Sequence, residues 1–262
     1  MTAPLVVAVT GSGQGIGLAV ARRFAERGAR VVVSDVDAAR CQRAADEIGA
    51  LAVPADVTDA AQCRQLVERT VAAHGRLDVM VCNAGIMQLK PFLELEAADW
   101  DRMLGVNAKG CFLSLQAAGR QMLQQAPLAA GRPRGKIITI ASIAGRSGAG
   151  PIAAVTPHYR ASKAAVLSLT QSAAIAFAPH LTVNAICPGL VESEMWRGID
   201  RDWGALQGLG EGQFWQQRIA SIPMGRPQQP EDVADLATML AAPESDYMTG
   251  QAINVDGGLM MN

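Results

Sequence analysis

Thr10-Gly11-Ser12-Gly13-Gln14-Gly15-Ile16-Gly17 joins the apolar run Leu5–Val9 to a segment with helical spacing, Ile16–Arg27. Glycines let the backbone turn tightly, and free N–H groups at a helix N-terminus favour a phosphate. The stretch does not satisfy the G-x-G-x-x-G spacing, because Ile16 and Leu18 stand where a third glycine would be. It therefore predicts a strand, a tight turn and a helix, with either a nucleotide or nothing bound at the turn.

The same alternation of strand and helix continues along the chain. Further strands are expected at Arg30–Ser34, Leu51–Pro54, Leu77–Cys82, Lys136–Ala141, Leu181–Cys187 and Ala252–Val255, and further helices at Ala38–Ile48, Ala60–His74, Ala97–Gln125, Ser162–Phe177 and Glu231–Leu240. Continuous apolar strands are typical of a parallel sheet covered on both faces. We expect an α/β fold: one doubly wound, Rossmann-type domain over residues 1–262, with a mostly parallel seven-stranded sheet.

Composition excludes several classes of function. The 262 residues carry a net charge of -1 with no basic run, so we expect no nucleic-acid partner and no membrane partner. The five cysteines are widely spaced, which predicts neither a disulfide framework nor a metal site. No apolar stretch approaches the roughly 20 residues of a membrane span, and the apolar N-terminal run is interpreted as a strand rather than a signal. A cytoplasmic protein is expected.

Residues 190–222 depart from the alternation, because they contain no clear strand and carry Trp196, Trp203, Phe214 and Trp215. Such a segment after a sheet strand is either a separate apolar cluster, a subunit contact or a lid over a substrate pocket. The position in the chain does not decide between these readings; we take residues 190–222, after Pro188-Gly189, as a substrate lid.

Asp35 stands at the end of the second expected strand. A carboxylate there can accept hydrogen bonds from both ribose hydroxyls of an adenosine, and it repels a 2′-phosphate. Val36 and Asp37 follow, so no adjacent Lys or Arg is available to receive that phosphate. The sequence therefore predicts NAD rather than NADP as cofactor; Asp37 is better placed than Asp35 to cap the next helix.

Tyr159 and Lys163 are four residues apart at the start of an apolar helix, so their side chains project from one face. A free tyrosine has a pKa near 10, and a nearby ammonium stabilises the phenolate. The pair is therefore either a proton-transfer couple whose tyrosine pKa is lowered, or two surface residues at helical spacing.

Ordered motifs decide for the first reading. Besides the glycine turn, the chain contains Asp56-Val57, Asn83-Ala84-Gly85, Pro188-Gly189 and Asp256-Gly257-Gly258, together with Asn107, Ser142, Tyr159 and Lys163. Over nearly its whole length the chain thus resembles the short-chain dehydrogenase/reductase family. The resemblance implies that Tyr159 is the general acid/base, that Ser142 holds the substrate oxygen, that Lys163 binds the nicotinamide ribose and tunes Tyr159, and that Asn107 supports a proton-relay water.

The resemblance also implies the remaining site residues. The cofactor-binding set is Gly11, Gln14, Gly15, Ile16, Gly17, Asp35, Val36, Asp56, Val57, Asn83, Ala84, Gly85, Tyr159, Lys163, Pro188, Gly189, Val191 and Ser193. Substrate contacts are expected from Ser142, Tyr159, Glu192 and Trp196, with His158 as a further polar side chain beside the site. The chain departs from the family at Cys82, at Ser193, and between Ser142 and Tyr159, where about four extra residues fall within 148–157.

Within the family, the segment after Pro188-Gly189 is similar to bacterial sorbitol-type polyol dehydrogenases and to acetoin reductases, the 2,3-butanediol dehydrogenases. A polyol is favoured because Glu192 and His158 could bond extra hydroxyls, although both could equally face solvent. An inactive NAD-binding scaffold is the alternative of another class, disfavoured by the intact set of four catalytic residues. The family's tetramers imply a homotetramer.

Overall fold

The computed structural model describes residues 4–147 and 151–261, and its centre is a seven-stranded sheet in which every pairing is parallel. The strands lie in the order β3 (Leu51–Ala52), β2 (Arg30–Ser34), β1 (Val6–Thr10), β4 (Val79–Cys82), β5 (Gly135–Ile140), β6 (Leu181–Pro188) and β7 (Ala252–Val255). The predicted α/β class is confirmed. From β1 the chain adds β2 and β3 on one side and then β4 to β7 on the other side. This change in the order of strands places a crevice at the carboxyl ends of β1 and β4.

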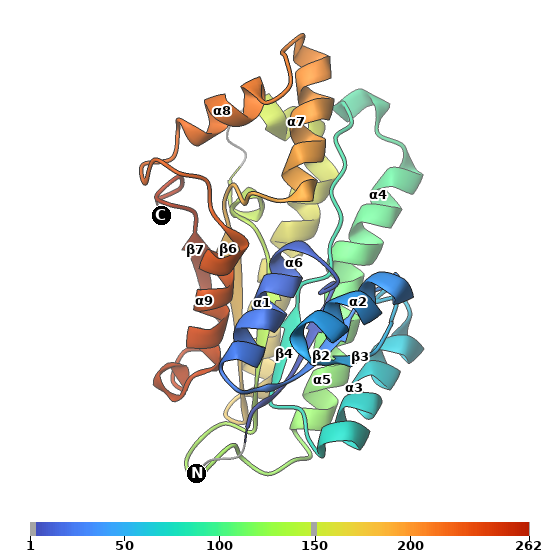
Figure 1. The fold of residues 1–262 in the computed structure, drawn as a ribbon, viewed down its shortest axis with the longest axis vertical. Helices are drawn as coiled ribbons and strands as arrows, with labels where there is room; N and C mark the ends of the chain where they lie inside the picture. Colours follow the sequence, from blue (N-terminus) through green and yellow to red (C-terminus); the bar gives the residue numbers. More distant parts are fainter. Residues whose placement is uncertain (1–3, 148–150, 262) are drawn as a thin grey trace.

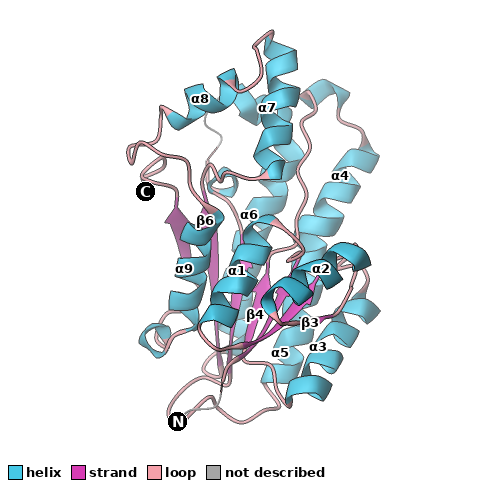
Figure 2. Ribbon diagram, viewed as in Figure 1, coloured by secondary structure: helices cyan, strands magenta, loops and turns pink. Residues whose placement is uncertain are grey.

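Helices cover both faces of the sheet (Figures 1 and 2). Their bounds are α1 (Gly15–Glu26), α2 (Ala38–Ile48), α3 (Ala60–His74), α4 (Ala97–Leu104), α5 (Gly110–Met122), α6 (Pro157–Phe177), α7 (Glu194–Gln207), α8 (Gln213–Ile219) and α9 (Pro230–Ala241). One apolar core lies under α1, α2 and α9, and a second lies under α3, α5 and α6. This two-sided burial explains why the strands are apolar at every position rather than at alternate ones.

Two of the expected helices differ from the structure. The segment expected as one helix over 97–125 is divided by a π-helical turn at Gly105–Lys109, and α5 ends at Met122. The turn coincides with Asn107, whose side chain bonds outside its own helix, as described below. The helix expected from Ser162 begins five residues earlier at Pro157, because proline is tolerated in the first helical turn.

The segment 190–222 forms α7 and α8, which stand beyond the carboxyl edge of the sheet (Figure 1). Trp203 and Phe214 are buried with Val155 and Ile199 in a cluster separate from the two main cores, and Trp196 packs against it. The inner aromatic residues therefore form an apolar cluster of their own. Among the described residues, no helix is both long and apolar enough to cross a membrane.

Candidate active site

The glycine turn between β1 and α1 is shaped by close backbone contacts. Gly11 has φ +61°, and a Cβ on it would lie 2.7 Å from the Cα of Ala84. A Cβ on Gly17 would collide with the Gly11 carbonyl oxygen. The N-terminus of α1 carries no acidic residue in its first turn and no side-chain cap from Gln14. Its N–H groups therefore remain free to bind an anion, and the cradle fits a pyrophosphate.

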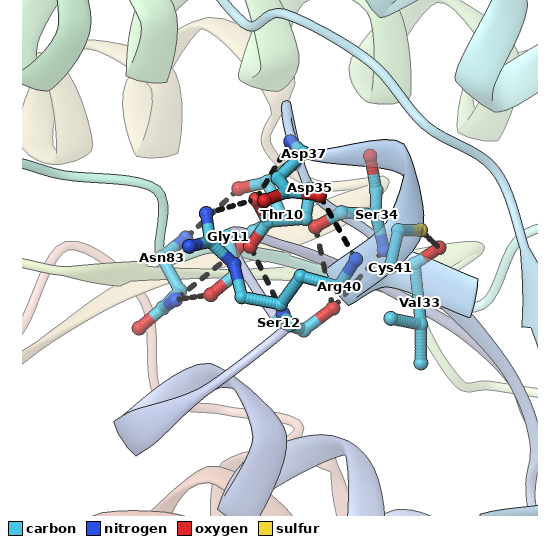
Figure 3. A network of polar contacts seen from close by, with 11 residues as sticks. Thr10, Gly11, Ser12, Val33, Ser34, Asp35, Asp37, Arg40, Cys41 and Asn83 are labelled. Carbon is cyan, nitrogen blue, oxygen red and sulfur yellow. Dashed lines mark hydrogen bonds and ion pairs between the residues drawn. The ribbon is translucent and has the colours of Figure 1, made fainter. Parts of the chain in front are cut away.

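Asn83 ties the ends of β1 and β4 together (Figure 3). Its Nδ2 donates to the carbonyl oxygens of Thr10 and Gly11, both at 2.9 Å. In return, the Thr10 hydroxyl accepts from the backbone N–H of Asn83 at 3.1 Å and of Ala84 at 3.2 Å. These bonds fix the Asn83-Ala84-Gly85 segment as one wall of the crevice.

Asp35 lies at the end of β2 with only 5% of its surface exposed. Oδ2 accepts from the Gly13 N–H at 3.1 Å, while Oδ1 accepts from the Asp37 N–H at 3.1 Å and from Arg40 Nη2 at 2.6 Å (Figure 3). The expectation that no cation stands near Asp35 is therefore wrong. Arg40 lies in the first turn of α2, and the helix brings it back over a residue five positions earlier.

Ser142, Tyr159 and Lys163 meet beyond the carboxyl ends of β5 and β6. Ser142 follows β5, and its Oγ accepts from the Ala144 N–H at 3.1 Å. Tyr159 and Lys163 project from the first turns of α6, with Lys163 Nζ 5.9 Å from the centre of the Tyr159 ring. Lys163 is 6% exposed, and its Nζ donates to the Ile140 carbonyl at 2.8 Å.

The pKa values of this pair are set by burial. Burial raises the pKa of Tyr159, and a hydrogen bond with Ser142 offsets part of that rise. Burial also lowers the pKa of Lys163 to about 8. The lowered tyrosine pKa expected from the sequence is not found, because the effect of burial on Tyr159 outweighs the hydrogen bond with Ser142.

Asn107 is 1% exposed and lies outside the cavity, where its side chain connects two segments that form the site. Its Oδ1 accepts from the Ile86 N–H at 2.8 Å, and its Nδ2 donates to the Ile86 carbonyl at 2.9 Å and to Ser162 Oγ at 3.0 Å. The side chain thus links the segment after β4 to α6. The π-helical turn orients it for these bonds.

One cavity of about 680 Å³ connects the glycine turn to Ser142, Tyr159 and Lys163. It is lined by every residue of the expected cofactor set, and also by Ser142 and Trp196. Asn107 stands outside it. The lining residues that sequence reasoning missed are Arg40, Ala55, Thr58, Ile86, Arg102, Val106, Ile140, Ala141 and Glu194. Most of these carry no chemical signature in the sequence, because their position follows from the ends of strands and helices that only the folded chain brings together.

Two expected substrate residues do not reach the cavity. Glu192 is exposed, and its Oε2 accepts from Gln229 Nε2 at 2.9 Å. Val191 pairs with Gln228 in an isolated β-bridge, so neighbouring side chains alternate: Val191 and Ser193 line the cavity, and Glu192 faces away. His158 is fully buried and does not line the cavity either.

Glu194, at the start of α7, lines the cavity in place of Glu192 and pairs with Arg197 at 2.5 Å. Of the extra residues expected between Ser142 and Tyr159, Gly148, Ala149 and Gly150 lie outside the described residues. Among the described residues, no cluster of three or more His, Cys, Asp or Glu side chains could hold a metal ion.

Comparisons with known proteins agree with this geometry. A family model described as enoyl-(acyl carrier protein) reductase matches residues 11–260. The chain is 39% identical to a sorbitol dehydrogenase of Cereibacter sphaeroides (97% of this chain, 96% of the relative) and 39% identical to a galactitol 2-dehydrogenase of Agrobacterium fabrum (98% of each). It is 38% identical to an L-2,3-butanediol dehydrogenase of Corynebacterium glutamicum, over 98% of this chain and 99% of the relative.

Solved structures of dehydrogenases and reductases superpose on nearly the whole chain. A short-chain type dehydrogenase/reductase from Mycobacterium marinum superposes with a TM-score of 0.86 at 34% identity, covering 100% of this chain and 97% of the other. An actinorhodin polyketide ketoreductase variant, crystallised with NADPH, superposes with a TM-score of 0.90 at 30% identity, covering 99% of both chains.

Proposed function

The chain belongs to the short-chain dehydrogenase/reductase family and is a dehydrogenase that acts on CH–OH groups; from this premise we propose that it interconverts a secondary alcohol and a ketone with NAD, most readily on a polyol such as sorbitol. The observation that carries the proposal is the single cavity that runs from the glycine turn to Ser142, Tyr159 and Lys163. A dinucleotide laid along it would have its pyrophosphate at the N-terminus of α1 and its nicotinamide beside Tyr159.

Nicotinamide, when bound, accepts or donates the hydride. In the oxidising direction, the side chains of this chain supply the proton chemistry. Ser142 donates its hydroxyl hydrogen bond to the substrate oxygen and holds it beside Tyr159, and Tyr159 removes the proton from the alcohol. In the reducing direction, Tyr159 returns that proton to the developing alkoxide. A general acid/base of this kind contributes typically about 10²–10⁴-fold to the rate.

Lys163 has two tasks in this proposal. An ammonium has three N–H donors, and among the described residues the Ile140 carbonyl takes one of them, which leaves donors for the ribose hydroxyls of the nicotinamide half. Its positive charge stabilises the Tyr159 phenolate as the proton leaves. Asn107 holds the segment after β4 against α6. Because its side-chain amide is engaged by Ile86 and Ser162, a relay water would have to be held by its backbone carbonyl.

The adenosine half is assigned to the end of the cavity formed by Asp35, Val36, Asp56 and Val57. The Asp35 carboxylate suits the two ribose hydroxyls, which supports NAD as the preferred cofactor. Val36 is 67% exposed beside the cavity, an unusual position for a valine that adenine would cover.

A polyol is the first choice of substrate because two relatives that cover nearly the whole chain are named for sorbitol and galactitol. Trp196 and Glu194 line the same cavity as Ser142 and Tyr159, and we assign to them an apolar wall and a hydrogen-bond acceptor for the substrate. A vicinal diol or acetoin is the second candidate, because the butanediol dehydrogenase relative is almost equally similar. Cytoplasmic location and a homotetramer complete the proposal. Exposed apolar side chains on α5 and α6, Phe112 and Ile175, are consistent with a subunit contact there.

The direct test is NADH formation across a panel of polyols, vicinal diols and simple secondary alcohols, with the wild type and with Tyr159→Phe. We expect polyols to give the highest kcat/KM, and the Phe variant to lose about 10²–10⁴-fold in kcat while its Kd for NAD stays within about twofold. Near-normal turnover of Tyr159→Phe would place the acid/base elsewhere. Much faster oxidation of simple aliphatic or aromatic alcohols would remove the substrate assignment and leave the reaction type standing.

A further inference from the structure

Asp200 is a buried carboxylate in the middle of α7, and its hydrogen bonds go to another helix. It is 6% exposed. Its Oδ2 accepts from the Gly212 N–H at 2.6 Å, and its Oδ1 accepts from the Trp215 N–H at 2.8 Å. These are its hydrogen-bond partners among residues 4–147 and 151–261. A buried charge needs such partners, so Asp200 joins α7 firmly to the first turn of α8.

The first turn of α8 depends on this carboxylate. The free N–H groups at the start of a helix are usually bonded by the side chain of the residue just before it. That residue is Gly212, which has no side chain to serve as a cap. Asp200 supplies the acceptor from twelve residues earlier in the chain. It therefore fixes the position of α8 against α7 as well as the start of α8.

Two aromatic residues in the first turn of α8 pack on Trp196. The ring centre of Trp215 lies 5.3 Å from that of Trp196. The ring centre of Phe214 lies 6.4 Å from that of Trp196, with an angle of 27° between the planes. Phe214 is buried and also packs on Trp203, at 5.8 Å between ring centres. Because Trp196 lines the cavity of the proposed active site, the bonds of Asp200 determine where the partners of a cavity wall stand.

The Trp196 ring is held by this packing. Asp200 and Trp196 stand four residues apart on α7, so they project from the same face of the helix. The backbone N–H of Trp196 donates to the Ser193 hydroxyl at 3.4 Å, which fixes the main chain at the start of α7. The ring itself contacts the aromatic residues of α8. A side chain in a pocket wall binds a ligand more tightly when its rotamer is already fixed, because binding does not have to order it.

We propose that Asp200 is a positioning residue for the substrate: by fixing the first turn of α8, it holds the Trp196 ring in the orientation that covers the carbon chain of the substrate. This inference rests on the proposed function, because it requires an alcohol or ketone beside Trp196. It deepens that function, since it assigns the shape of the substrate wall to a carboxylate that does not line the cavity. Without Asp200 the ring would populate other rotamers, and substrate binding would have to order it.

The test is a double-mutant cycle on the full-length enzyme with Asp200→Ala, Trp196→Ala and the variant that carries both. For each protein we measure kcat and KM for the best secondary alcohol of the panel, and Kd for NAD. Asp202→Ala is the matched control, because Asp202 is exposed on the same helix and does not line the cavity. Thermal unfolding checks that each variant is folded. If Asp200→Ala does not fold, Asp200→Asn replaces it in the cycle, because it keeps the size of the side chain and one acceptor oxygen.

We expect Trp196→Ala to raise KM by about 10–100-fold, because it removes a wall of the substrate pocket. Asp200→Ala should raise KM by about 3–10-fold, the range for ordering one side chain on binding. The double variant should have the KM of Trp196→Ala within about twofold, since Asp200 has nothing to position once the ring is absent. In all variants kcat should stay within about threefold and Kd for NAD within about twofold, and Asp202→Ala should match the wild type.

Near-ultraviolet circular dichroism of the cofactor-free variants gives a second readout. The indole rings of Trp196 and Trp215, with their centres 5.3 Å apart, contribute a coupled signal. This signal should be lost in Trp196→Ala and reduced in Asp200→Ala, and the double variant should match Trp196→Ala. An Asp200→Ala spectrum identical to that of the wild type overturns the inference.

Additive effects of the two substitutions on KM also overturn it, because they show that Asp200 does not act through the Trp196 ring. A lower kcat or a weaker Kd for NAD in Asp200→Ala with an unchanged KM has the same meaning, as does an equal effect of Asp202→Ala. The proposed function fails in a different way. A wild type that oxidises no secondary alcohol of the panel with NAD overturns both proposals, whereas turnover with an additive cycle overturns the role of Asp200 alone.

Discussion

Lys163 lowers the stability of the cofactor-free protein, and its replacement by methionine is expected to raise it. The side chain is 6% exposed, and burial lowers its pKa from 10.5 to about 8. A difference of roughly 2.5 pKa units corresponds to about 3 kcal/mol of free energy of unfolding. Lys163→Met removes that penalty and also the hydrogen bond to the Ile140 carbonyl, which costs about 1–2 kcal/mol. The net gain at pH 7 is about 1–2 kcal/mol.

The pH dependence gives the sign of the effect. Between about pH 8 and 10.5 the unfolded chain binds more protons at this lysine than the native chain does, so wild-type stability rises with pH over that window. Below pH 8 the penalty is fully present. The advantage of Lys163→Met should therefore be complete at pH 7 and should shrink, then reverse, as pH approaches 10.5.

The assay is urea unfolding of cofactor-free wild type and variant at pH 7 and at pH 10, with activity measured alongside. Lys109→Met is the control, because it removes the same group from an exposed position and should stay within about 0.5 kcal/mol of wild type. A Lys163→Met variant that is less stable than wild type at pH 7, or whose difference does not change with pH, would refute the reasoning. We expect the stabilised variant to have lost almost all activity, as a strained functional site predicts.

Two further predictions concern the buried Lys136 and Glu194 in the segment 190–222. Lys136 is fully buried, and its Nζ contacts the Ala242 carbonyl at 2.6 Å, Ser245 Oγ at 2.8 Å and Asp246 at 2.7 Å. Lys136→Met removes these three contacts but leaves Asp246 paired with Arg132 at 2.7 Å, and it also removes the cost of burying the ammonium. We therefore expect it to lower the free energy of unfolding by about 1–2 kcal/mol in the same urea assay, and an unchanged or higher stability would contradict this. Glu194→Gln should raise KM for polyols by several-fold without changing Kd for NAD. The control Glu192→Gln, whose residue lies outside the cavity, should change neither constant. Equal effects of the two variants would show that Glu192 also contacts the substrate.

The sequence predicts the sheet from local patterns, whereas the catalytic set stays a prediction that the family resemblance implies. Continuous apolar runs specify buried parallel strands, and the spacing of Tyr159 and Lys163 on one helix fixes their common face. Every residue expected to bind the cofactor lies along one cavity, because most of them stand at the carboxyl end of a strand or just after it, and Tyr159 and Lys163 reach the same edge from α6.

The sequence does not predict side-chain contacts that depend on where an extended segment becomes a helix or on a single turn of a helix. Glu192 lies in the extended segment that the bridge of Val191 to Gln228 holds, whereas Glu194 is the first residue of α7, and only Glu194 lines the cavity. The pairing of Arg40 with Asp35 is not evident from the sequence, because the two residues are five positions apart and only the first turn of α2 brings them together. Such contacts depend on the direction of side chains at element ends, which composition and periodicity do not encode.

The pKa of Tyr159 and the pKa of Lys163 are shifted in opposite directions by the same cause, burial. Burial favours the neutral form of each group, so the phenol keeps its proton at pH 7, while Lys163, with a pKa of about 8, is still mostly charged. Ribose hydroxyls bonded to Lys163 would replace part of the lost hydration of the ammonium and raise its pKa. An ammonium kept charged beside Tyr159 would in turn lower the cost of forming the phenolate. Cofactor binding would then set the proton-transfer groups before the alcohol reacts, which couples an occupied nicotinamide site to an active tyrosine.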